Sequence, residues 1–156
     1  MIVSIVLLLV VTGIVAAVHL MNQEEIPCMV IRKGDQEISV SFEDLNQGSF
    51  SGELIDGKGD ATFHEYTGVL LKELLKQKGI DIARLSGVTV TSADNYSVTF
   101  TKEELLQENK VYVAITADGA KIEGIDPGSD GVQIIVFEDP NSRRCVRFAA
   151  ILEIAS

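Results

Sequence analysis

The sequence predicts a compact α+β single domain that is rich in β-strands, and three observations support this. Residues 28–156 contain many short runs of alternating or β-branched side chains, and Gly, Asp and Asn turns separate them. One segment, 67–78, carries leucines at helical spacing. The part that follows the N-terminal apolar run has about 130 residues, a size that supports one hydrophobic core.

The N-terminal segment is predicted to direct the chain to a membrane. Residues 2–21 are almost entirely apolar, and His19 is the only ionisable side chain among them. Twenty residues of helix span about 30 Å, the thickness of the hydrocarbon core of a bilayer. Two alternatives stay open: residues 1–21 are a transmembrane anchor, or they are a signal peptide with a cleavage site at Val15-Ala16-Ala17. Either places the domain at 28–156, after a linker at 22–27, outside the cytoplasm, membrane-anchored or secreted.

The charge balance excludes some partners. The formal net charge is −10, and every charged side chain lies after Asn22. Nucleic acids and anionic lipid surfaces select Lys and Arg, so an acidic domain argues against both. We therefore expect no nucleic-acid partner.

The clearest helix is predicted at 67–78. Four leucines form its apolar stripe, namely Leu70, Leu71, Leu74 and Leu75. Thr67 is a plausible N-cap, and Gly79 occupies the position where a left-handed C-terminal residue is common. Shorter helices are predicted at 43–45 and at 101–107, where Thr101 and Glu104 fit a capping box.

Strands are predicted over most of the remaining domain. The turns Gly34-Asp35 and Asp118-Gly119 are typical of tight hairpins. The predicted strands are 28–33, 36–42, 49–55, 88–91, 96–100, 111–116, 132–137 and 146–154.

Most catalytic patterns are missing, and we predict neither catalytic residues nor a metal site. His19 and His64 are the only histidines, which excludes a histidine-rich metal centre. The glycine-rich loop at 56–60 departs from a calcium loop and is better explained as a solvated turn. Arg143, Arg144 and Arg147 form a basic cluster that either binds an anionic ligand or pairs with acids such as Glu138 and Asp139.

The chain has two cysteines, Cys28 and Cys145, near the two ends of the domain. In an oxidising compartment they could form a disulfide, which would stabilise the fold by up to about 4–5 kcal/mol in the chain-entropy model. The alternative is two buried thiols, and the sequence leaves both open.

One ordered set of motifs resembles a known family. The run Tyr66-Thr67-Gly68-Val69-Leu70-Leu71, followed by Leu74-Leu75 and Gly79-Ile80, is similar to a signature of the sulfite-oxidase-type molybdopterin-binding domain. The segment Asp94-Asn95-Tyr96 stands where that family has Asp-Gly-Tyr, and the later elements follow in the family's order. The resemblance covers about residues 28–155 and implies a β-rich α+β fold.

The resemblance also implies a site. Catalytic members of the family hold molybdenum through a pterin dithiolene and one cysteine thiolate. The matching stretch here, 51–63, contains no cysteine. The loops that match the family's cofactor side carry Tyr66, Thr67, Gly68, Asp94, Asn95 and Tyr96. With Arg143 and Arg144, these are the predicted ligand-binding residues.

Three functional hypotheses follow. The first is a non-catalytic extracytoplasmic domain that binds a small ligand or a protein partner as an accessory to a redox system, without a cofactor of its own. The second is a molybdopterin-dependent oxidoreductase. The third is a structural surface module.

Overall fold

The computed structural model describes residues 27–140 and 142–156. The strands are β1 (Met29–Lys33), β2 (Gln36–Val40), β3 (Gly48–Ile55), β4 (Ala61–Leu70), β5 (Gly87–Ser92), β6 (Ser97–Thr101), β7 (Val111–Ala117), β8 (Ala120–Lys121), β9 (Gln133–Val136) and β10 (Ala149–Ala155). The helices are α2 (Phe42–Leu45), α3 (Leu71–Gln77) and α4 (Lys102–Leu106), with short 3-10 turns η1 (Ile82–Arg84) and η2 (Ser142–Arg144).

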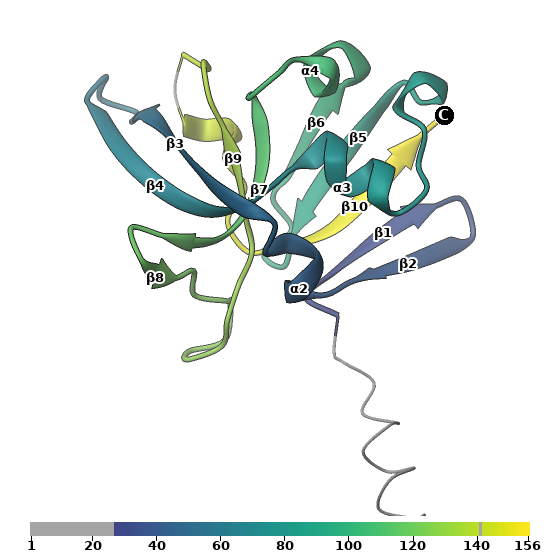
Figure 1. Cartoon of the computed structure of the whole chain (residues 1–156), viewed down its shortest axis with the longest axis horizontal. Coiled ribbons are helices and arrows are strands. Elements are labelled where there is room, and N and C mark those ends of the chain that lie inside the picture. Colours follow the sequence, from purple (N-terminus) through teal and green to yellow (C-terminus); the bar gives the residue numbers. More distant parts are fainter. Residues whose placement is uncertain (1–26, 141) are drawn as a thin grey trace, which may run out of the picture.

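The strands form two sheets. The first has the order β2-β1-β10-β5-β6, and the second has the order β3-β4-β7-β8, with β9 also paired to β7. The β1–β10 pair is parallel, whereas the other strand pairs are antiparallel. Figure 1 shows β3 and β4 as a long hairpin that projects from the second sheet, away from β1 and β2. This β-rich architecture with few helices agrees with the predicted fold class.

An aliphatic core joins the two sheets. It includes Leu74 and Leu75 of α3, Val90 of β5 and Val113 of β7, all completely buried. Because the leucine stripe of α3 fills this core, the helix is held by tertiary packing as well as by its own hydrogen bonds. We call this set of buried residues, which is aliphatic except for Phe100, the aliphatic core.

The main helix is shorter than the sequence predicts. The segment predicted as 67–78 begins as strand, because β4 continues through Leu70 and pairs with β7 from Tyr66↔Ala117 to Leu70↔Tyr112. The helix α3 therefore starts at Leu71, and Thr67 does not cap it. Sheet pairing with β7 prevails here over a helical leucine pattern.

Several local signals are confirmed. The N–H of Ile80 donates to the carbonyl of Leu75, and Gly79, at φ +77°, donates to Lys76, which together make a Schellman motif after α3. Thr101 and Glu104 form the predicted capping box of α4. The predicted strands are all present, with ends shifted by up to three residues. No part of β4 was predicted as a strand, and the short strand β8 was not predicted either.

The N-terminal prediction lies outside the described residues. Over 27–140 and 142–156, no helix is long and apolar enough to cross a membrane. The anchor or signal peptide at 1–21 and most of the linker at 22–27 therefore stay predictions.

Candidate ligand-binding groove

Four aromatic rings gather on the face of the second sheet that turns away from the aliphatic core. Phe50 stacks on Tyr112 with ring centroids 3.9 Å apart, and on Tyr66 at 5.2 Å. Phe137 meets Tyr112 edge-on at 5.7 Å. We call these four residues the aromatic cluster. Each such pair stabilises by about 0.5–1.5 kcal/mol beyond area burial.

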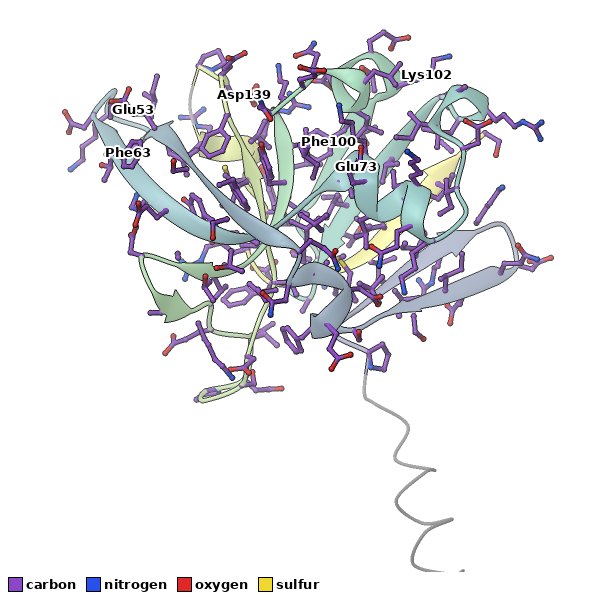
Figure 2. All side chains as sticks on the ribbon, in the orientation of Figure 1. Glu53, Phe63, Glu73, Phe100, Lys102 and Asp139 are labelled. Atoms are coloured by element: carbon purple, nitrogen blue, oxygen red, sulfur yellow. The ribbon has the colours of Figure 1, made fainter. Side chains whose placement is uncertain are left out.

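A groove of about 620 Å³ opens beside this cluster. It runs along β3 from Phe50 to Ile55 and has Phe137, Glu138 and Asp139 on its other side. In Figure 2, Glu53 marks the β3–β4 hairpin and Asp139 the segment that follows β9. Its volume is in the range of small-molecule sites.

A glycine allows the two walls to approach. A Cβ on Gly52 would lie 2.6 Å from the ring of Phe137, well inside normal contact. Only glycine therefore lets β3 lie directly against this ring without a shift.

The wall after β9 is fixed by an ion-pair network. Arg144 binds both carboxylate oxygens of Glu104, at 2.6 and 3.1 Å, and contacts Asp139 at 3.4 Å. Lys110 lies 3.9 Å from Asp139, whose side chain is only 7% exposed. The forked bond from Arg144 holds the pKa of Glu104 below its usual value. Arg144 also donates to the backbone carbonyl of Thr99 at 3.2 Å, so the network attaches the groove's wall to both α4 and β6.

The predicted residues Tyr66 and Thr67 lie beside a smaller pocket of about 340 Å³, which is lined by residues of β3, β4 and β7 and by Gly119. Burial raises the pKa of Tyr66 to about 12, with smaller contributions from Cys145 and Asp118. The phenol is therefore neutral at ordinary pH. Gly68 faces the backbone of β7, since a Cβ there would lie 2.0 Å from the Val113 carbonyl oxygen.

The other predicted residues lie elsewhere. Asp94 and Asn95 form the exposed β5–β6 turn, and Asn95 has φ +68°. Tyr96 is 48% exposed and donates its hydroxyl to the carbonyl of Arg143 at 2.6 Å. This turn lines neither of the two cavities along β3. Arg144 pairs with Glu104 and with Asp139, of which Asp139 is one of the two acids that the sequence suggested as partners.

The two cysteines are not joined in a disulfide. The thiol of Cys28 donates to the carbonyl of Val40 at 3.2 Å. The sulfur of Cys145 accepts from the N–H of Val136 at 3.4 Å. Of the two alternatives that the sequence leaves open, a disulfide or two thiols, the structure has two thiols.

Sequence reasoning missed the residues that shape the groove, namely Phe50, Gly52, Asn109, Tyr112 and Phe137. A usable signal existed in 111–117 and 133–137, where apolar residues occupy both faces of each strand. Such strands must have both faces covered, which predicts packing beyond the aliphatic core.

Among the comparisons with known proteins, the match is to solved structures. No protein-family model matches the sequence, and a search of curated proteins finds no match. The structure is similar to that of the sulfane dehydrogenase SoxCD from Paracoccus pantotrophus, with a TM-score of 0.60 and 18% sequence identity. The match covers 81% of this chain and 37% of that chain. At this identity the similarity shows the fold alone, and it supports the sulfite-oxidase-type architecture.

The donor atoms of the groove do not fit a molybdenum cofactor of the kind that the family resemblance implies. That site needs a cysteine thiolate, and neither cysteine lines the groove. Burial raises the pKa of Cys145, which favours its thiol form, whereas metal binding requires the thiolate. No group of three or more metal-binding side chains gathers in the part of the chain that the structure describes.

Proposed function

We propose that the chain is a binding domain of the sulfite-oxidase-type fold that carries out no molybdenum chemistry. It binds a small ligand or a protein partner in the groove beside β3 and serves as an accessory to a redox system. The observation that carries this proposal is the groove of about 620 Å³, floored by aromatic rings and lacking a cysteine. Apolar walls with a few polar groups are typical of binding sites.

The proposal places this domain outside the cytoplasm, held to the membrane by residues 1–21 or secreted after their removal. The apolar run at 2–21 supports this placement. The smaller pocket beside Tyr66 supports a binding role over a purely structural surface module.

Metal and pterin analysis of protein purified from its native host tests the proposal. We expect substoichiometric molybdenum and no bound pterin. Stoichiometric molybdenum would overturn it and favour the second candidate, a molybdopterin-dependent oxidoreductase, for which the structural match to SoxCD is the support.

A second experiment tests the groove. Gly52→Val would place methyl groups against Phe137 and narrow the cavity. Ala120→Val, at an exposed position of the short strand β8, is the matched control. Loss of ligand or partner retention in the first variant alone supports the groove as the site. Equal retention in both, with both folded by circular dichroism, contradicts it.

A further inference from the structure

The strand β3 forms an edge of its sheet. Over the described residues it pairs with β4 and with no other strand. Its eight residues, Gly48–Ile55, include one charged side chain, Glu53, and no proline. Edge strands normally carry lysines, prolines or bulges that prevent another strand from pairing with them, and β3 has none of these.

The phase of the ladder shows which backbone groups face the open edge. In an antiparallel sheet, successive residues direct their N–H and C=O groups to opposite neighbours. Glu65 of β4 accepts from the N–H of Asp118 at 2.7 Å, so its backbone points towards β7. Its neighbours His64 and Tyr66 therefore point towards β3, where they pair with Gly52 and Phe50.

The end of the β3–β4 hairpin leads to the same assignment of bonded and open backbone groups. Asp56 donates to the carbonyl of Asp60 at 2.9 Å, which places even-numbered β3 residues in the bonded pairs. The N–H and C=O groups of Ser51, Glu53 and Ile55 consequently point to the open edge. They repeat at two-residue spacing, as an added strand requires.

The groove described above lies along this edge. Its opposite wall, with Glu138 and Asp139, is held in place by the network around Arg144. A strand entering the groove would hydrogen-bond to β3 and direct alternate side chains towards the aromatic floor.

The charge of the groove selects the occupant. Glu53 and Glu138 are exposed, and over the described residues neither forms an ion pair. Asp139 is already neutralised by Arg144 and Lys110. The whole chain has a net charge of −10, which opposes pairing with a second copy of itself.

From these observations we infer that β3 accepts an extended, lysine- or arginine-rich segment of a partner protein as an additional strand. Main-chain bonds to Ser51 and Glu53 would hold it, and Glu53 and Glu138 would select its positive charge. The inference rests on the proposed function, since it names the partner of the same groove.

The test uses the full-length chain, ¹⁵N-labelled in a mild detergent, and an acetylated, amidated octapeptide of alternating Lys and Val. We expect amide exchange at Ser51 and Glu53 to slow about tenfold or more on binding. Gly52 and Leu54, already bonded to β4, should change little. The same peptide with alternate backbone nitrogens methylated, and a Glu/Val peptide, should bind at least about tenfold more weakly.

A charge reversal provides the matched comparison. The double variant Glu53→Lys/Glu138→Lys should weaken the Lys/Val peptide about tenfold or more. Glu103→Lys/Glu123→Lys changes two exposed acids away from the groove, produces the same net charge, and should bind almost as the unmodified chain does.

Several results would overturn the inference. They are no binding at millimolar peptide, equal weakening in both double variants, or protection along β2 or β6 in place of β3. Protection of Ser51 that grows with protein concentration and needs no peptide would assign the edge to a second copy. Failure of the proposed function is recognised separately, because it appears as stoichiometric molybdenum or pterin in native protein whatever the peptide does.

Discussion

The two faces of the second sheet differ although the same strands build both. Along β7, Val111 and Val113 enter the aliphatic core, while Tyr112 belongs to the aromatic cluster and Ala114 packs in the same hydrophobic group as these rings. The first face is closed by the other sheet and by α3. The second face is only partly closed by its own hairpin, and the groove opens there.

This difference separates stability from binding. A close-packed aliphatic interior has no room for a ligand and no exposed polar groups to recognise one. The second face combines the buried rings of the aromatic cluster with the open edge of β3 and the exposed carboxylates of the groove. The following predictions compare the two faces, from the largest expected effect to the smallest.

Truncation in the aliphatic core should have the largest effect. Leu74 is completely buried, so Leu74→Ala should lower the free energy of unfolding by about 3 kcal/mol. Phe50 is only half-buried, and Phe50→Ala should cost about 2 kcal/mol despite the larger side chain. Urea denaturation measures both. A larger loss at Phe50 would show that the aromatic face is as closed as the other.

The contact at Gly52 should give the next effect. Gly52→Ala places a methyl group against the ring of Phe137 and should destabilise the protein by about 1–2 kcal/mol. Phe137→Leu removes the clashing ring. In the Gly52→Ala background it should therefore destabilise the protein less than it does in the unmodified chain. Thermal denaturation measures the stability of the two single variants and the double variant. If the two single losses of stability simply add in the double variant, the close approach of β3 to Phe137 is contradicted.

The Arg144 network should make stability depend on pH. Its contact holds the pKa of Glu104 below the ordinary value of 4.5. This contribution is present above that value and is lost as the pH falls through the lower, folded-state pKa. Arg144→Met should cost about 1 kcal/mol at neutral pH and flatten the fall in stability below about pH 5.

The control for the network is Arg84→Met, at an arginine whose pair with Asp81 is exposed. Urea titrations at pH 7, 5, 4 and 3 compare the variants. Parallel acid slopes for the unmodified chain and Arg144→Met would refute the assignment to Glu104.

Removal of one hydroxyl in the aromatic cluster should have the smallest effect. The Tyr112 hydroxyl donates to the side-chain carbonyl of Asn109 at 3.0 Å, at the border of the groove. Tyr112→Phe should cost about 0.5–1 kcal/mol, because water can replace the donor to the exposed Asn109. Thermal denaturation is sufficient to measure it, and a loss near that of Leu74→Ala would mean that the site is closed to water.

The sequence alone determined the local features of the protein. Glycine and aspartate turns, the capping box at Thr101 and the left-handed Gly79 are set by backbone and neighbouring side chains, so short segments contain the necessary information. The β-rich class followed from the same signals, and the family resemblance gave the architecture that the match to SoxCD supports.

Only the tertiary structure decided the rest. The boundary between β4 and α3 depends on pairing with β7, more than forty residues away, so the leucine spacing could not reveal it. Phe50 and Phe137 meet because the fold brings β3 against the residue that follows β9. Likewise, Arg144 contacts Glu104 only through the fold, and β3 has an open edge because, among the described residues, it pairs with β4 alone. Such contacts depend on which distant segments become neighbours, a property of the whole chain and not of any local pattern.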